Sequence, residues 1–308
     1  MIASEVQASR KGGLSFAMPM APSTLKTSSA MAMQPGADAT QSGAGDPIDE
    51  PEALRRLQLD DDPSAQYYAA WWLGRQRSQH PQAVILLNKA LQQRRPRQLG
   101  DDVEENAVAR NAARALGKLG PIAAPAIPDL LETLNDDDHG LREAAARSLG
   151  QLNATAAVPL LVARLASGPA VAGAREEGTP RLKEPCDALL EALGDIGVVE
   201  DQVLQVLHLF LDHERPVVRS SACRALLQLT GESQWGERMV ALLHHDQLQV
   251  RRAALMDLGA TGWYPALDAI SNTLAENSLK LIALRGLAEQ ADNPAPDEAV
   301  LDAMDALL

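Results

Sequence analysis

The sequence predicts an all-α fold, an α-solenoid of about seven two-helix repeats that follows a disordered N-terminal tail. Three observations lead to this prediction. Ala and Leu dominate the composition while β-branched residues are sparse, which favours helix along the whole chain. A leucine recurs at intervals of 29 to 44 residues, in nearly every case four residues after an alanine. A second apolar segment of helical character follows each of these leucines.

The repeats can be aligned on positions 74, 117, 150, 194, 227, 259 and 288. The residue before each position is leucine in every repeat: Leu73, Leu116, Leu149, Leu193, Leu226, Leu258 and Leu287. The residue five before is alanine in all repeats but the fourth: Ala69, Ala112, Ala145, Leu189, Ala222, Ala254 and Ala283. Such a small side chain indicates that a neighbouring helix backbone passes close by. Pro128 and Pro159 are expected near the starts of second helices, where a missing N–H costs little.

Residues 1–48 differ in composition from the rest of the chain. They are rich in Ser, Ala, Gly, Pro and Met without helical periodicity, which predicts a disordered extension before a solenoid of residues 49–308. A signal peptide is disfavoured because no continuous apolar stretch follows Arg10-Lys11. An organelle transit peptide is disfavoured by the few basic residues and by Glu5.

A Val-Arg pair preceded by an acidic residue stands before the first helix of two repeats: Val218-Arg219 after Glu214, and Val250-Arg251 after Asp246. This pattern resembles HEAT repeats, and the resemblance covers residues 51 to about 290. Acidic and basic residues at these positions (Asp137 with Arg142, Asp246 with Arg251) are expected to form a structural ladder between repeats.

Two repeats carry extra residues between their second helix and the next first helix. These insertions, Arg94 to Glu105 and Ser167 to Lys183, are expected to project from the same edge of the solenoid. Insertions placed together in this way often build a binding rim.

The charge balance is 28 basic against 41 acidic residues, a net of -13, which argues against general nucleic-acid binding. Two cysteines exclude a disulfide framework and favour a reducing cytosol. No apolar run reaches the length of a membrane span, so no membrane insertion is expected. The six histidines show no metal-ligand spacing, and His213-Glu214 is the one His-Glu pair, so no metal site is predicted.

The aromatic residues are concentrated in the first repeat. The chain has four Trp, three Tyr and two Phe, and four of these nine fall at positions 67 to 72. Helical spacing aligns Tyr67 with Trp71, and Tyr68 with Trp72. Tyr67 and Trp71 occupy positions that are mainly charged in other repeats, so we expect an exposed contact surface. Tyr68 and Trp72 replace small residues in a repeat that nothing is expected to precede, so they either close the solenoid end or join a surface for a planar conjugated ligand or a partner protein.

Tyr67 to Leu73 reads YYAAWWL, and Arg110 to Gly120 reads RNAARALGKLG. Together these segments resemble the E-type subunit of the heterodimeric phycobilin lyases, specifically of the phycocyanin alpha-subunit phycocyanobilin lyase. The resemblance implies pairing with an F-type subunit and transfer of phycocyanobilin, an open-chain tetrapyrrole, to a cysteine of the apo-phycocyanin alpha subunit. It also implies a cyanobacterial cytoplasmic location and assigns bilin binding to the first motif: Tyr67, Tyr68, Trp71, Trp72 and Leu73. The 48-residue leader is a departure from the family pattern.

In that reaction the acceptor protein supplies the thiolate, so the lyase need only hold the bilin, which is a substrate and not a permanent cofactor. Three arginines of the first insertion are candidate partners for its propionates: Arg94, Arg95 and Arg97. Cys186 follows Pro185 at a helix start, where the pKa of a thiol is lowered, and is a candidate transient thiol. Cys223 is expected in the core. The alternative function is a non-catalytic scaffold or chaperone for antenna subunits that uses the same aromatic face.

Overall fold

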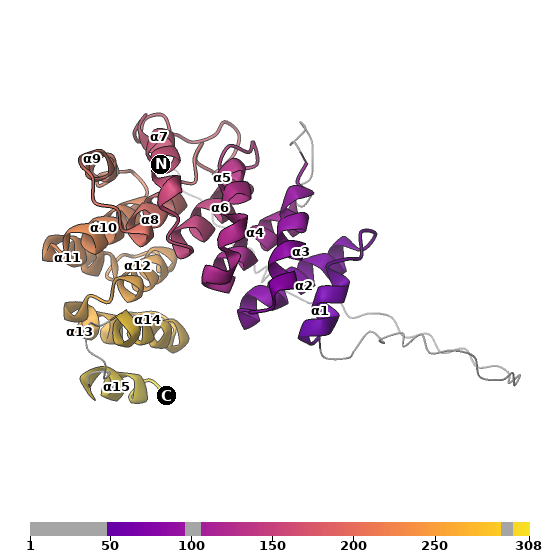
Figure 1. Ribbon diagram of the computed structural model, residues 1–308. Coiled ribbons are helices and arrows are strands. Elements are labelled where there is room, and N and C mark those ends of the chain that lie inside the picture. Colours follow the sequence, from indigo (N-terminus) through magenta and orange to yellow (C-terminus); the bar gives the residue numbers. More distant parts are fainter. Residues whose placement is uncertain (1–47, 96–105, 291–297) are drawn as a thin grey trace, which may run out of the picture. The chain divides into compact units, whose positions relative to one another are not determined.

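A computed structural model describes residues 48–95, 106–290 and 298–308. The predicted leader therefore lies outside the described residues except for Ile48. Every regular element in the described ranges is helical, apart from one isolated bridge between Arg175 and Leu182. The predicted all-α solenoid is confirmed, and Figure 1 shows its helices following one another in chain order.

The first helices of the repeats form one row, in which each helix packs against the next. Each contains one of the seven aligned positions: α2 (Pro63–Gln76), α4 (Ala107–Leu119), α6 (His139–Gln151), α8 (Cys186–Ile196), α10 (Pro216–Thr230), α12 (Leu248–Thr261) and α14 (Asn277–Gln290). The leucine before each aligned position is buried, as the repeat predicts. The alanines at the position five before are also buried, and these two positions form a continuous core along the row.

The second helices complete the repeats. They are α3 (Pro81–Gln92), α5 (Ile127–Thr133), α7 (Val158–Leu165), α9 (Asp201–Leu209), α11 (Ser233–Leu242), α13 (Leu267–Asn272) and α15 (Glu298–Asp305). Short 3-10 turns lead into three of them: η1 (Gly120–Ala126), η2 (Thr155–Ala157) and η3 (Tyr264–Ala266). Pro128 and Pro159 lie in the first turns of α5 and α7, as expected from their missing N–H groups.

A further helix, α1 (Glu50–Arg56), precedes the first repeat and packs against α2. Its Ala53 and Leu54, with the following Leu57, are buried in the common core. The expectation that nothing precedes the first repeat is therefore wrong. The signal was present in the sequence, because Asp49 caps α1 by accepting from the backbone N–H of Glu52 at 2.9 Å and Pro51 fits the first turn.

Neighbouring first helices approach closely where glycine occupies the aligned position. A Cβ placed on Gly74 would lie 2.9 Å from the Cα of Ala115 on α4, closer than real Cβ contacts allow. The same holds for Gly194 and Ala225, where the distance would be 2.7 Å. Small residues at these positions set the spacing of the row, because any side chain would push the helices apart.

The arginine ladder between repeats is confirmed, although its chemistry differs from the expected Asp–Arg pairs. Arg142 donates through Nη1 to the backbone carbonyls of Asp136 and Asp137 at 2.9 and 3.1 Å, and not to a carboxylate of that turn. Its Nη2 donates to the carbonyl of Lys183, just before α8, at 2.7 Å. Arg251 repeats the arrangement by donating to Asp246 and, across the repeat boundary, to Leu274 at 2.8 Å. Each arginine thus caps the turn before its own helix and fixes the next repeat.

The second insertion, Ser167 to Lys183, contacts the turn that precedes α10. The Nε2 of His213 lies 3.2 Å from the carbonyl oxygen of Gly173, and Arg175 pairs with Glu214 at 3.2 Å. The first insertion from residue 96 to 105 lies outside the described residues.

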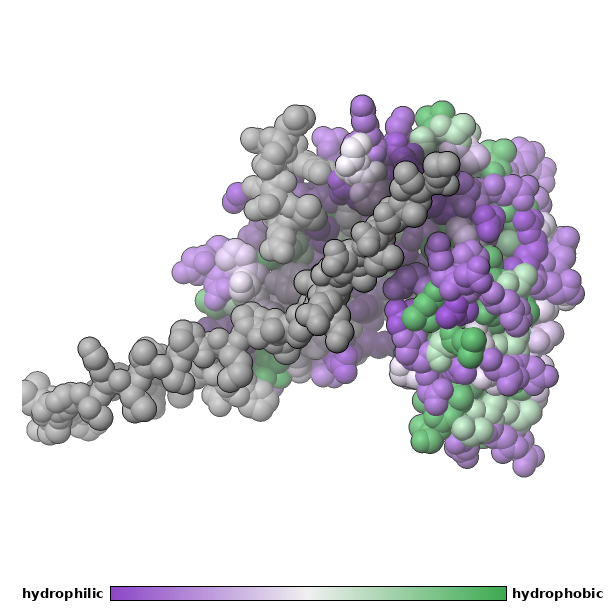
Figure 2. Space-filling view, turned by 180° about the vertical axis from the view of Figure 1, so that it is seen from behind, coloured by the Kyte–Doolittle hydropathy of each residue, from purple (hydrophilic) through white to green (hydrophobic). Residues whose placement is uncertain are grey.

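Hydrophilic residues predominate on the face shown in Figure 2, where hydrophobic ones form separate groups among them. None of the helices in the described ranges combines the length and the apolar character that a membrane crossing requires.

Candidate functional site

The aromatic cluster lies on α2, whose boundaries follow from its flanking residues. Asp62 caps the helix by accepting from the backbone N–H of Ala65 at 2.9 Å, and Pro63 takes the first helical position. Arg77 ends the helix in the left-handed conformation with φ 50°. Leu73 is completely buried and fixes which side of α2 faces the core. It therefore supports the cluster from beneath and offers no surface to a ligand.

The aromatic side chains divide into an exposed group and one packing residue. The exposed fractions are 37% for Tyr67, 62% for Tyr68 and 44% for Trp71. Exposure of Tyr67 and Trp71 was predicted from the repeat alignment and is confirmed. Trp72 instead packs against the core. Trp72 therefore contributes to packing, although α1 and not an aromatic ring covers the end of the solenoid. Tyr68 does not close that end, because it is the most exposed of the four.

Contacts among these rings differ from the expected i,i+4 pairs. Tyr67 and Tyr68 meet edge to face with centroids 5.6 Å apart, at an interplanar angle of 89°. The guanidinium carbon of Arg75 lies 5.4 Å from the centroid of the Trp71 ring, which places a cation over the indole. The exposed surface of α2 is therefore aromatic from Tyr67 to Trp71 and cationic one turn later at Arg75. We call Tyr67, Tyr68 and Trp71 the aromatic surface.

The neighbouring helix α4 holds this surface in place. The side-chain amide of Asn111 donates to the backbone carbonyl of Tyr67 at 2.8 Å. At the other end, Gly74 lies against Ala115, and the Cδ of Lys118 would be 3.6 Å from a Cβ at Gly74. These two ties fix α4 beside α2 on both sides of Trp71 and give the aromatic surface a rigid support.

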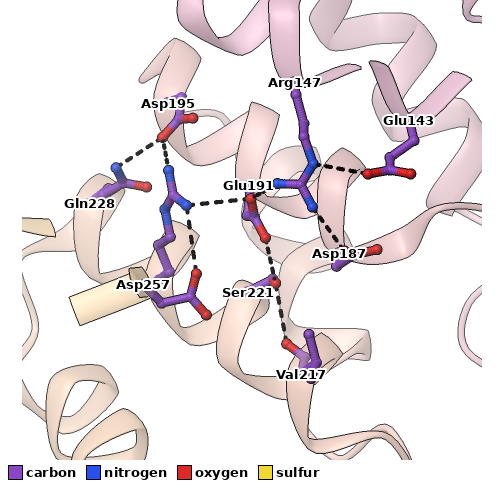
Figure 3. A network of polar contacts seen from close by, with 10 residues as sticks. Glu143, Arg147, Asp187, Glu191, Asp195, Val217, Ser221, Gln228 and Asp257 are labelled. Atoms are coloured by element: carbon purple, nitrogen blue, oxygen red, sulfur yellow. Dashed lines mark hydrogen bonds and ion pairs between the residues drawn. The ribbon is translucent and has the colours of Figure 1, made fainter. Parts of the chain in front are cut away.

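A polar network lies farther along the row, on α6, α8, α10 and α12 (Figure 3). Arg147 pairs with Glu143, Asp187 and Glu191, and Arg224 pairs with Glu191, Asp195 and Asp257. Ser221 donates to Glu191 at 3.0 Å. Burial, together with the nearby charge of Glu191, raises the pKa of Asp257 to about 7. The repeat alignment could have revealed the network, because the charge alternates between Arg147, Glu191 and Arg224 at one repeat position of successive first helices.

Arg94, the first of the three arginines of the first insertion, lies among carboxylates. Arg94 pairs with Glu132 at 2.6 Å and with Asp136 at 3.3 Å. It lines a depression of about 540 Å³ that also holds Asp129 and Asp137. Such acidic surroundings disfavour a propionate, so the predicted contact at Arg94 is without support.

Arg95 is exposed, and its backbone is held by the side chain of Asn106, which accepts from the Arg95 N–H at 2.9 Å. Arg97 lies outside the described residues. Propionate contacts at these two arginines remain predictions.

Both cysteines are buried. Cys186 is the first residue of α8, but burial, reinforced by Asp187 and Glu184, raises the pKa of its thiol to about 12. The expected lowering by the helix N-terminus is therefore wrong, because loss of hydration and two carboxylates outweigh the helix dipole. Cys223 lies in the core as predicted, and burial raises its pKa to about 11. Neither thiol is poised to react with a bilin.

Comparison with known proteins places this geometry in a family. Residues 65–93, which span the aromatic helix, match the PBS lyase HEAT-like repeat, and residues 98–177 match HEAT repeats. The chain is 44% identical to the phycocyanobilin lyase subunit alpha of Picosynechococcus sp. (strain ATCC 27264 / PCC 7002 / PR-6), over 77% of this chain and 86% of that protein. This chain belongs to the phycocyanobilin lyase alpha-subunit family.

Two further relatives cover more of the chain. The bilin biosynthesis protein RpcE of Synechococcus sp. (strain WH8020) is 48% identical over 85% of this chain and 96% of its own length. A chain in the structure of the complex of CpcE and CpcF of phycocyanin lyase from Nostoc sp. PCC7120 is 41% identical, with a TM-score of 0.75. That alignment covers 89% of this chain and 100% of the other. The family resemblance drawn from the YYAAWWL segment is confirmed.

Proposed function

We propose that this chain is the alpha subunit of a phycocyanobilin lyase, which attaches phycocyanobilin to phycocyanin as a heterodimer with a CpcF-type subunit. The observation that carries the proposal is the match to the complex of CpcE and CpcF, which extends over the full length of the matched chain. The aromatic surface on α2 supports it, since a conjugated tetrapyrrole needs exposed rings on which to stack.

The reaction is the addition of a thiol across a carbon–carbon double bond. The thiolate of a cysteine of the apo-phycocyanin alpha subunit attacks the ethylidene carbon of bilin ring A, a C–S bond forms, and the proton of the thiol ends on the former double bond. No oxidant or reductant is consumed. Because the acceptor supplies the sulfur, the lyase needs no accessible thiol of its own, in keeping with the buried Cys186 and Cys223.

The contribution of this chain is to hold the flexible bilin in one conformation. Orientation of this kind supplies up to about 7–11 kcal/mol of barrier lowering in ideal cases. The rigid attachment of α2 to α4 suits that task, since the rings that contact the ligand stand on a helix fixed at both ends. Phycocyanobilin is accordingly a substrate, and the reaction is assigned to the cyanobacterial cytoplasm, where free thiols such as those of this chain stay reduced.

Coexpression tests the proposal. The chain would be produced with a CpcF-type subunit, enzymes that make phycocyanobilin, and either the phycocyanin alpha or beta apo-subunit. We expect covalent colour on the alpha subunit, seen as visible absorbance that survives denaturation, and a loss of that colour when either lyase subunit is omitted. A scaffold or chaperone would raise the yield of soluble antenna subunit without any covalent chromophore, and that outcome would contradict the proposal.

A further inference from the structure

Alignment of the repeats places the side chains of successive first helices in matching stripes, each spaced by four residues. The stripes are Tyr67, Trp71 and Arg75 on α2; Arg110, Arg114 and Lys118 on α4; Glu143, Arg147 and Gln151 on α6; and Asp187, Glu191 and Asp195 on α8. Because α2 packs against α4, the stripe with Trp71 lies next to the stripe with Arg114. The hydrogen bond of Asn111 and the close approach of Ala115 to Gly74 bracket this pair of positions.

The cations of these stripes differ in what they contact. Arg147 and Arg224 lie on either side of the three carboxylates of α8 and share them. Arg110 is 3.6 Å from Asp138. Arg114 and Lys118, by contrast, have no ion pair or hydrogen bond in the part of the chain that the structure describes, although Arg114 is half-buried. A half-buried guanidinium without a counter-charge is unusual in a chain with a net charge of -13.

The cations near Trp71 therefore form a local excess of positive charge beside exposed aromatic rings. Arg75 stacks over the indole from the same helix, while Arg114 and Lys118 stand on the matching stripe of α4, the helix that packs beside α2. Rings and unpaired cations side by side suit a ligand that is both conjugated and anionic. A bilin has these two properties, since its pyrrole rings carry two propionates.

We infer that Arg114, assisted by Lys118, binds a propionate carboxylate of the bilin while the rings lie on Trp71. This inference rests on the proposed function and assigns the propionate contact to α4 in place of the first insertion. The guanidinium would form a bidentate pair with the carboxylate, a geometry that Lys cannot reproduce. Its role is to orient the substrate, because the contact fixes where ring A stands relative to the acceptor thiol.

Binding measurements on the purified complex with the CpcF-type subunit test this assignment. Absorbance titrations would compare phycocyanobilin with its dimethyl ester, in which both propionates have lost their charge. Arg114→Gln should weaken binding of the free acid about ten-fold, the loss typical of one charged hydrogen-bonded contact, and Arg114→Lys should weaken it less. Arg285→Gln is the matched control, because Arg285 occupies the same repeat position on α14, far along the row.

The ester separates propionate binding from other roles of Arg114. The wild-type complex should bind the ester more weakly than the acid, and Arg114→Gln should then cause no further loss. Equal weakening of acid and ester by Arg114→Gln would overturn the assignment, as would unchanged affinity for the acid. A loss confined to affinity for the CpcF-type subunit would show that an acidic partner surface occupies Arg114 instead. If the wild-type complex binds neither compound and transfers no bilin, the proposed function itself has failed.

Discussion

Among single residues, Asp257 on α12 has an unusual carboxyl pKa. It is almost fully buried, with Arg224 at 3.6 Å and Glu191 nearby as a second negative charge. Loss of hydration dominates, so its pKa rises from 3.8 to about 7. In the folded protein the carboxyl binds a proton at pH values where it would be ionised in the unfolded chain. Folding is therefore opposed by its ionisation as the pH increases.

The sign of this linkage gives a prediction for Asp257→Asn. Between about pH 4 and 7 the folded state binds more protons at this site than the unfolded state, so the free energy of unfolding falls as the pH rises through that range. The variant lacks this titration, and Arg224 retains Asp195 at 2.6 Å. The stability of Asp257→Asn relative to the wild type should thus improve from pH 4 to pH 7 and stay level above it. Urea unfolding at several pH values measures the difference, and a pH-independent difference would contradict the altered pKa.

At the scale of the element, α2 shows two functions of one helix. Leu73 lies in the core and Trp71, two residues earlier, on the surface. Leu73→Ala should cost about 2–5 kcal/mol of stability, because it leaves a cavity at a position that is leucine in all seven repeats. Chemical unfolding followed by circular dichroism checks this. A loss below about 1 kcal/mol would mean that the first repeat adds little to the core.

The positions of most helices were predictable from the sequence. The recurring leucines and alanines located all seven first helices, since the leucines fill the core and the small alanines allow neighbouring helices to approach. The exposure of Tyr67 and Trp71 followed from charged residues at the same positions in other repeats. Helix α1 was missed because it is short and lies outside the repeat.

Pairing between repeats could not be predicted in the same way. The carboxylates that surround Arg94 come from residues that only the folded chain brings together. Glu184 and Asp187 are sequence neighbours of Cys186, but the burial that dominates the rise of its thiol pKa is a property of the fold. The same reason applies to Arg110 and Arg114, which have similar basic neighbours in the sequence. Only Arg110 lies near the carboxylate of Asp138. The electrostatic environment of a side chain thus depends on tertiary contacts, which the repeat pattern of the sequence does not predict.

For the whole molecule, we propose that residues 1–48 form an extension that the solenoid does not need for folding. The buried apolar residues of the described chain run from Ala53 to Val300, and α1 already covers the first repeat. Removal of residues 1–47 should leave the melting temperature within a few degrees of the full chain, as measured by scanning calorimetry. A fall of more than about 10 °C, which for a chain of this size corresponds to several kcal/mol, would show that the extension contributes to the core.

We propose that the aromatic surface of α2 presents the bilin for transfer. The covalent chromophore content of the phycocyanin alpha subunit tests this role, measured after coexpression with the CpcF-type subunit and either the Trp71→Ala or the Met256→Ala variant. Met256 is the matched control, because it occupies the same repeat position on α12 and is 41% exposed. Loss of one stacking ring costs about 0.5–1.5 kcal/mol, so Trp71→Ala should fold normally but lower chromophore transfer several-fold, while Met256→Ala retains it. Full transfer by a stably folded Trp71→Ala variant would contradict this role of the aromatic surface.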